Sequence, residues 1–486
     1  MPGAADLWIP RFLFQRGLGL VYFIAFMVAA NQFRPLLGEH GLQPVPLFVS
    51  RISFQDSPSL FFFAPKDWAF GAAAWIGLAL SVAAMLGFTE RFGTPISVVA
   101  WAAMWLLYIS FVNVGQTFYS FGWETMLLEA GFCAIFLGAS ATLPSPIPLW
   151  ILRWMEFRVM FGAGLIKLRG DPCWRDLTCL DYHYETQPIP NPLSWYFHWL
   201  PRWALHGGVA FNHFVELIVP FAYFLPQPIA GIAAAITILF QLMLMLSGNL
   251  SFLNLLTIVI ALPMLDARWF AKWLPVTVPA TLHEPARWFE FATIGYAAVV
   301  ALLSIRPAIN LISSRQMMNA SFEPLHIVNT YGAFGSVGRV RDEVIVEGTA
   351  GPTPSEYADW RAYEFKGKPG DPMRTPPQIA PYHLRLDWQM WFAAMSNYTE
   401  EPWFVNFVAK LLQGDRETLS LLRFNPFAAA PPKYVRARLY RYRFSTGEER
   451  KRTGAWWQRE LEGEWFPAIS LDTPGLQRVL RDQGWK

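Results

Sequence analysis

Apolar positions fill most of the first 306 residues, in runs that short polar stretches separate. A bilayer core about 30 Å thick needs about 20 apolar residues of helix. The runs therefore predict an α-helical polytopic membrane domain with about eight or nine spans. The predicted spans cover residues 12–30, 68–88, 95–114, 123–141, 149–168, 209–225, 228–246, 250–265 and 289–305. Nine spans that start in the cytosol would place the C-terminal end of the chain on the far side of the membrane.

The pattern changes after Arg306, where short β-rich runs alternate with Gly, Pro and Asp. Predicted strands lie at 325–331, 339–347, 360–366, 434–444 and 456–461. Val340, Val344 and Val346 recur at every second or fourth position, as a half-buried strand requires. Residues 400–414 instead repeat apolar side chains at helical spacing and end at Gly414.

These patterns divide the chain into a transmembrane domain, residues 1–306, and a water-facing domain, residues 307–486. The second domain is expected to be a β-rich, sandwich-like α+β domain, built either as a β-sandwich or as an open antiparallel sheet with one or two helices.

Charge follows the same division. The chain is 53% hydrophobic and 15% charged, with a mean hydropathy of +0.26. Residues 1–306 hold 16 Lys+Arg and 16 Asp+Glu, whereas residues 307–486 hold 23 and 20. These counts make the first part roughly 10% charged and the second roughly 24%, close to an ordinary soluble domain. The composition argues against a soluble, disordered or nucleic-acid-binding protein. The net charge of +3 is too small to indicate a partner.

Ionisable residues inside the predicted spans are costly unless they are paired or hydrated, so each is a candidate functional residue. Glu129, Glu156 and Arg158 are expected to be buried polar groups, with Arg153 and Glu156 spaced for a local pair. Lys167 ends its span and either extends to the membrane interface or serves as a buried base.

Two further polar residues share one predicted span. His213 and Glu216 lie three positions apart on one helix, which suits two metal ligands. No third ligand is evident, so a polar pair within the helix bundle is favoured and no metal is expected.

The three cysteines give a modest test of topology. Cys133 lies in an apolar run and is expected to be a core thiol. Cys173 and Cys179 flank a five-residue loop. If this loop faces an oxidising compartment it can hold a disulfide, and two free thiols are an equal alternative.

The water-facing domain carries a strand rich in arginine and tyrosine, YVRARLYRYRF at 434–444, which includes Arg436, Arg438 and Tyr440. A solvated strand face with Arg stacked on Tyr is favoured over a nucleic-acid surface. Phosphate-binding glycine loops, nucleophile elbows and metalloprotease motifs are absent from the sequence. The residues alone therefore indicate no reaction and no cofactor.

Several long strings resemble the family of lipase maturation factors. They are WETMLLEAGFCAIFL at 123–137, NTYGAFGSVGRVRDEVIVEGT at 329–349, YEFKGKPGDPMRTPP at 363–377, LRLDWQMWFAA at 384–394 and WWQRELEGEWFP at 456–467. The resemblance implies a multi-pass protein of the endoplasmic reticulum membrane, or of the inner membrane for a bacterial relative. It also implies a non-catalytic, chaperone-type factor that helps secreted, homodimeric lipases to assemble, with the C-terminal domain engaging the client.

On that hypothesis, the client-binding surface is predicted to contain aromatic and arginine side chains of the water-facing domain: Asp387, Trp388, Trp391, Arg436, Arg438 and Tyr440. The partners expected are a secreted lipase or another exported protein and the lipid bilayer, and no nucleic acid. For the string 384–391 the alternative is a simple core element, with Leu386, Trp388 and Met390 on one face.

A shorter string, FGAGLIK at 161–167 followed by Trp174, is similar to a helix of vitamin-K-dependent carboxylase-like membrane domains. That resemblance implies a membrane enzyme with Lys167 as base and His213 and Glu216 lining the same cavity. A transporter would show inverted repeats, and the sequence shows no convincing internal symmetry.

Overall fold

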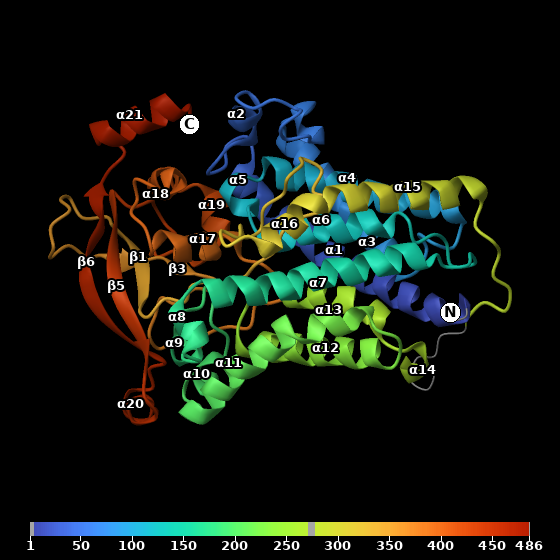
Figure 1. Ribbon diagram of the computed structural model, residues 1–486. Helices are drawn as coiled ribbons and strands as arrows, with labels where there is room; N and C mark the ends of the chain where they lie inside the picture. The colour runs from blue at the N-terminus through green and yellow to red at the C-terminus, as the bar shows by residue number, and fades with distance from the viewer. Residues whose placement is uncertain (1–3, 271–277, 486) are drawn as a thin grey trace.

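The computed structural model describes residues 4–270 and 278–485. It consists of a bundle of long helices with a β-sheet region at one end (Figure 1). The bundle is formed by α1 (Ala4–Leu37), α3 (Asp67–Met85), α4 (Thr94–Val114), α6 (Gly122–Ala134), α7 (Pro146–Arg169), α11 (Arg202–Leu217), α12 (Ile229–Ser247), α13 (Leu253–Ala261), α15 (Arg287–Leu303) and α16 (Ile305–Ile312).

Six stretches of the described chain are long and apolar enough to cross a membrane: 6–37, 67–85, 94–114, 202–224, 229–247 and 287–312. The remaining bundle helices are shorter, as α6 and α13 are, or carry several charges, as α7 does. Each of them matches a predicted span. The start of α1 and the end of α16 lie at opposite ends of the bundle (Figure 1), as an odd number of crossings requires.

Short elements connect the bundle helices. They are α2 (Val45–Val49), α5 (Gln116–Tyr119), α8 (Pro172–Arg175), α9 (Leu180–Thr186), α10 (Ser194–His198) and α14 (Ala267–Phe270), with the 3-10 helices η1 (Leu60–Phe62), η2 (Val219–Phe224) and η3 (Leu262–Met264). The group α8 to α10 lies at the end of the bundle nearest to the sheet (Figure 1).

Close approach of α1 and α3 sets one side of the bundle. Gly77 of α3 faces Phe26 of α1, and a Cβ at this glycine would lie 2.4 Å from the phenyl ring. Phe26 is buried and also makes an edge contact with Tyr108 of α4, at 5.4 Å between ring centroids. A small residue opposite an aromatic ring therefore lets these two helices pack closely, in addition to the Arg34–Asp67 ion pair between them.

Four antiparallel strands form the main sheet, in the order β2 (Arg361–Ala362), β1 (Arg341–Thr349), β5 (Tyr434–Phe444) and β6 (Trp457–Ile469). Val344 of β1 pairs with Leu439 of β5. The short strands β3 (Glu364–Phe365) and β4 (Leu422–Phe424) form a separate pair. The fold class is confirmed, and the open antiparallel sheet is the form present.

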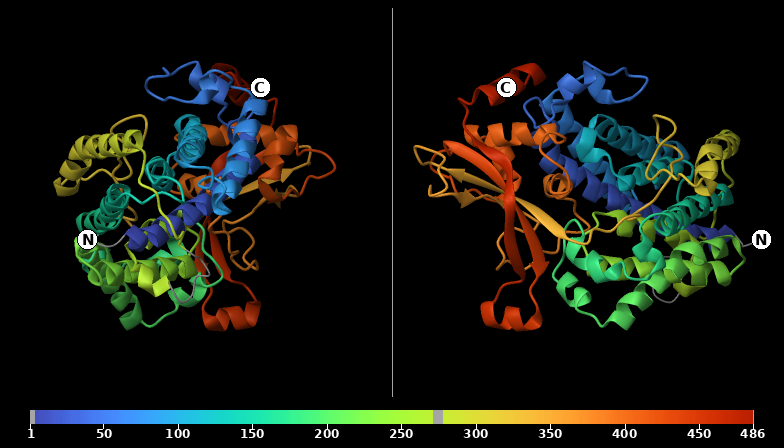
Figure 2. Two further views of the ribbon diagram at one scale, coloured as in Figure 1. Left: turned by 90° about the vertical axis from the view of Figure 1, so that its right-hand side faces the viewer. Right: turned by 60° about the vertical axis from the view of Figure 1, so that its left-hand side comes forward.

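The helices of the sheet region are α17 (Arg385–Ala393), α18 (Pro402–Gln413), α19 (Arg416–Ser420), α20 (Gly447–Thr453) and α21 (Pro474–Gln483). The predicted helix at 400–414 is confirmed as α18, and Gly414 ends it with a φ of 68°, which glycine adopts without strain. The long hairpin β5–β6 carries α20 at its tip (Figure 2), where Arg450 lies 4.7 Å over the Trp195 ring of α10.

One strand prediction is wrong. The segment 325–331 forms only an isolated bridge at Asn329, because its residues enter the bundle instead of pairing in the sheet. The segment 384–391 lies largely in helix α17, and Leu386, Trp388 and Met390 are all buried, as the core alternative expects.

The sheet region and the bundle share one continuous core. Trp403 of α18 packs against Phe118 of α5, at 5.8 Å between ring centroids. Trp388 of α17 packs against Trp123 of α6, at 5.0 Å. The sheet region is therefore attached to the bundle by side-chain packing as well as by the connecting chain.

Candidate functional site

A cavity of about 720 Å³ lies where the bundle meets the sheet region. Helices α7, α11, α12 and α13 line it from the bundle side. The segment 331–336 and helix α17 line it from the other side. Most of its wall is apolar, and polar side chains gather in a few places, as in small-molecule sites.

Lys167 is the principal charged group in this wall. Its Nζ lies 2.5 Å from Oε1 of Glu216 and donates to Oδ1 of Asn212 at 3.1 Å. Asn212 in turn donates to Oε2 of Glu216 at 2.9 Å. The Lys167 and Glu216 side chains are only 6% and 5% exposed, so Lys167 does not extend to the membrane interface. The pair balances two charges that neither could carry alone at this depth.

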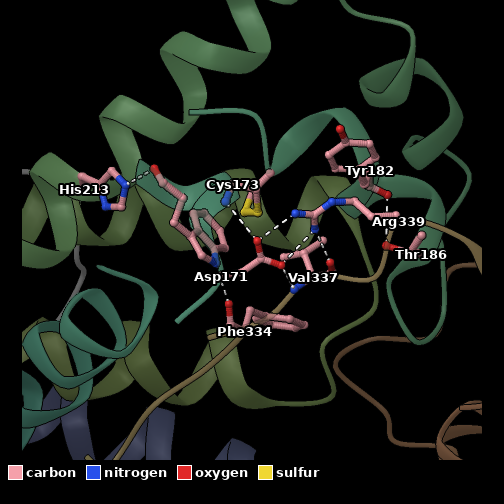
Figure 3. The surroundings of a disulfide bond; sticks show 10 residues. Asp171, Cys173, Tyr182, Thr186, His213, Phe334, Val337 and Arg339 are labelled. Carbon is pink, nitrogen blue, oxygen red and sulfur yellow. Dashed lines mark hydrogen bonds and ion pairs between the residues drawn. A yellow bond between two sulfur atoms is a disulfide. The ribbon is translucent and has the colours of Figure 1, made fainter. Parts of the chain in front are cut away.

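The other predicted residue of this group points elsewhere. The Nε2 atom of His213 lies 2.9 Å from the carbonyl oxygen of Trp174 (Figure 3). The structure therefore brings Lys167 and Glu216 together but leaves His213 outside the cavity. Over residues 4–270 and 278–485, no three His, Cys, Asp or Glu side chains are grouped to hold a metal ion.

A second histidine, which the sequence reasoning missed, does line the cavity. His183 lies on α9 and is buried. Burial, with the positive charge of nearby Lys167, lowers the pKa of His183 to about 4. Its imidazole is therefore neutral at neutral pH and adds no charge to the cavity.

Glu129 and Arg158 form a buried ion pair between α6 and α7. Glu129 also accepts hydrogen bonds from the backbone N–H of Asn329, at 3.0 Å, and from the Tyr331 hydroxyl, at 2.7 Å. Arg158 donates to the carbonyl oxygen of Asn329 at 2.6 Å. The pair thus holds the segment that enters the bundle, which explains why 325–331 is no strand.

Glu156 and Arg153 do not pair with each other. Arg153 donates to the carbonyl oxygen of Tyr223 at 2.8 Å. Glu156 is fully buried, and neither of its carboxylate oxygens has a hydrogen-bond partner among the described residues.

A further ion pair joins the two parts of the chain. Nη1 of Arg385 lies 2.8 Å from Oε1 of Glu124, and both side chains are 0% exposed. Arg385 also donates to the carbonyl oxygen of Phe118 at 2.6 Å and lies 3.4 Å over the Tyr119 ring. Sequence reasoning missed this pair, because only the fold shows that the arginine of α17 meets a carboxylate of α6.

Cys173 in α8 and Cys179, just before α9, are joined in a disulfide that spans the loop between the two helices. Next to it, Asp171 accepts two hydrogen bonds from Arg339, at 2.8 and 2.9 Å (Figure 3). The Arg339 side chain lowers the pKa of Asp171 to about 2. Trp174 donates to the carbonyl oxygen of Phe334 at 2.8 Å (Figure 3). The loop is therefore tied to the segment that leads into β1. Cys133 is buried and free.

The predicted client-binding residues occupy different environments. Asp387 is buried and accepts the backbone N–H groups of Gly367 and Lys368, at 2.5 and 3.0 Å. Trp388 is buried too. Trp391 lines the cavity and donates to the carbonyl oxygen of Thr186 at 3.0 Å.

The remaining three predicted residues lie on β5. Arg436 is paired with Glu347 at 2.9 Å and lies 3.9 Å over the Trp360 ring. Arg438 pairs with Glu356. Tyr440 is half-buried under Arg459, at 4.7 Å. These arginines already have acidic partners within the sheet region.

Comparison with known proteins covers both parts of the chain. The family model "Lipase maturation factor transmembrane domain" matches residues 9–272, and "Lipase maturation factor C-terminal domain" matches residues 327–467. The chain belongs to the lipase maturation factor family. Both walls of the cavity lie within matched regions, since Lys167 and Glu216 fall in the first and Trp391 in the second.

Individual members of the family are similar over nearly the whole chain. Lipase maturation factor 1 of Homo sapiens is 44% identical over 98% of this chain and 90% of its own length. Lipase maturation factor 1 of Mus musculus is 43% identical over the same shares. Lipase maturation factor 2 of Xenopus laevis is 29% identical over 98% of this chain and 85% of its own length. No solved structure matches the chain.

The family result decides between the two resemblances in the sequence. The chain is an integral membrane protein with several spanning helices, and it is a lipase maturation factor by family. The carboxylase-like alternative receives no support from these matches.

Proposed function

We propose that this protein brings a secreted lipase to its active form while the lipase is still at the membrane. The observation that carries the proposal is the similarity of 98% of the chain to proteins named lipase maturation factor 1. A role limited to membrane anchoring would need only the bundle. The likeness instead extends through the sheet region, at 327–467.

The proposed compartment is the lumen of the endoplasmic reticulum, or the periplasm for a bacterial source. The disulfide loop and the sheet lie at the same end of the bundle (Figure 1). A disulfide persists in an oxidising compartment. This end is therefore the one proposed to meet a client that is itself exported.

The proposed client contact is the outer face of β5 around Arg438 and Tyr440. Both side chains keep some exposure, whereas Asp387 and Trp388 are enclosed by the core. The Arg436–Glu347 and Arg438–Glu356 ion pairs hold the two arginine side chains in fixed positions on the sheet. We propose that Trp391 contributes from inside the cavity and does not touch a client directly.

Co-purification tests the proposal. The tagged full chain is isolated from membranes of cells that synthesise a dimeric lipase, and bound lipase is quantified. We expect newly made, inactive lipase to co-purify. Arg438→Glu should reduce the bound amount, and Arg361→Glu, a charge reversal at another arginine of the same sheet, should not. Absence of lipase from the wild-type sample contradicts the function, whereas equal loss in both variants contradicts only the contact surface.

A further inference from the structure

The proposed maturation role does not explain the cavity between the bundle and the sheet region. We propose that it binds a neutral acyl ester, of the mono- or diacylglycerol class, with the acyl chain along its apolar wall and the ester oxygen at Lys167. This inference stands apart from the maturation role, because it concerns a lipid ligand and its test contains no lipase.

Size and lining fit an acyl chain. A volume of about 720 Å³ lies within the range of about 300–1,000 Å³ that small-molecule sites span. The wall includes Met160 and Ala163 of α7, Phe240 of α12, and Trp391 and Phe392 of α17. Such a wall gains free energy by covering a hydrocarbon chain and offers it few polar partners.

The cavity reaches the membrane-facing side of the bundle. Phe211 of α11 and Met243 of α12 both line it, and both lie in stretches able to span a membrane. Met243 is 42% exposed, and Leu239 and Leu246, which share its face of α12, are also exposed and do not line the cavity. We therefore place the opening for a bilayer lipid beside Met243, between α11 and α12.

The polar side chains of the cavity around Lys167 favour a ligand group with an uncharged oxygen acceptor. A lysine ammonium has three protons to donate. Asn212 and Glu216 accept two of them, and among the described residues the third makes no hydrogen bond, with the Trp174 ring centroid 5.0 Å from Nζ. An ester carbonyl accepts a hydrogen bond and donates none, so it complements this proton.

Charge balance disfavours anionic lipid headgroups. Glu216 already neutralises Lys167. A fatty-acid carboxylate or a phosphate would add an uncompensated negative charge beside Glu216 in a desolvated site. Neutral His183 supplies no further positive charge for such a head. A neutral ester avoids this cost.

Binding of radiolabelled monoolein to the purified full chain in nanodiscs tests the proposal. We expect saturable binding that excess monoolein displaces better than oleate or phosphatidylcholine. The double variant Lys167→Met/Glu216→Gln removes both charges together and should weaken binding about tenfold or more, the value of a hydrogen bond from a charged donor.

A matched pair of variants tests the opening. Met243→Trp should slow monoolein binding, whereas Leu242→Trp should leave it unchanged. The two positions are adjacent on α12 and similarly exposed, at 42% and 45%, but only Met243 lines the cavity. Because both side chains face outward, neither variant is expected to disturb folding.

Three results would overturn the proposal. They are the absence of saturable binding, equal binding by wild type and all variants, and preferred binding of oleate or phosphatidylcholine. A chain that matures lipase normally yet fails to bind monoolein would refute this inference alone.

Discussion

Removing Arg385 should weaken the attachment of the sheet region to the bundle, because this arginine is the buried partner of Glu124. Its guanidinium lies 2.8 Å from the Glu124 carboxylate, and neither side chain has any exposed surface. Glu124 also accepts a hydrogen bond from the indole of Trp123, at 3.1 Å, and one from the Tyr108 hydroxyl. The carboxylate is therefore anchored in place and cannot turn toward water when its partner is lost.

The expected magnitude follows from that geometry. Deleting one member of a buried ion pair costs about 3–5 kcal/mol, because the other charge stays buried without compensation. Arg385→Met should lower the free energy of unfolding by this amount. Arg385→Met/Glu124→Gln should recover part of the loss, since it leaves no unpaired charge. Arg361→Met is the control, because the Arg361–Asp359 pair is exposed, at 57% and 69%, and exposed pairs are worth about 0–1 kcal/mol.

Chemical unfolding of the purified chain in detergent, followed by tryptophan fluorescence, measures these differences. Limited proteolysis reports on the contact itself, and Arg385→Met should expose the segment 313–340 to cleavage before the bundle helices are cut. The reasoning is refuted if Arg385→Met costs no more than Arg361→Met. It is also refuted if the double variant is as unstable as the sum of its two single variants.

Three further predictions concern local structure. On α3, Gly77→Ala should destabilise the fold by about 1–3 kcal/mol through overpacking against Phe26. Gly71→Ala, whose Cβ meets nothing within 4 Å, should be neutral or stabilising by about 0.5–1 kcal/mol. Thermal melts of both variants measure the difference, and equal effects would contradict the α1–α3 contact. Cys173→Ser/Cys179→Ser should lower stability by about 2 kcal/mol, the value for so short a loop, and an unchanged melting temperature would speak against the disulfide. The pKa of Asp171 in the fold, about 2, lies below the unfolded value of about 3.9, so its ionised form stabilises the protein above pH 4 and that contribution disappears as the pH falls toward 2. The melting temperature of wild type should therefore fall more steeply between pH 4 and pH 2 than that of Asp171→Asn, and parallel curves would contradict the role of Arg339.

Hydropathy predicts the bundle well because each span must bury an apolar length set by the bilayer. Even α6 and α7, which carry Glu124, Glu129, Glu156 and Arg158, lie within predicted spans. The strands β1 and β5 are equally evident, since alternation and β-branched residues mark them. The hydrophobic pattern misassigns a segment that packs inside the bundle instead of pairing in the sheet. Residues 325–331 look like a strand, but Asn329 and Tyr331 bind Glu129 inside the bundle.

The site is less predictable than the fold, because its residues come from segments that are distant in the sequence. Sequence shows that Lys167 and Glu216 are costly in a membrane, and the structure pairs them. It also favours a His213–Glu216 pair, because the two lie on one helix, yet His213 turns to the carbonyl oxygen of Trp174. Arg385 could not be assigned to Glu124, because contacts between distant segments arise only from the packing of α17 against the bundle.

The central claim is that this chain makes a secreted lipase active, and the specific activity of secreted lipase tests it most directly. Cells that lack their own lipase maturation factor 1 are given a dimeric lipase together with this full chain, and enzyme activity in the medium is divided by lipase mass. The account predicts that wild-type chain restores specific activity while Arg385→Met does not. Lipase that is secreted but inactive in the presence of well-expressed, membrane-inserted wild-type chain would contradict it.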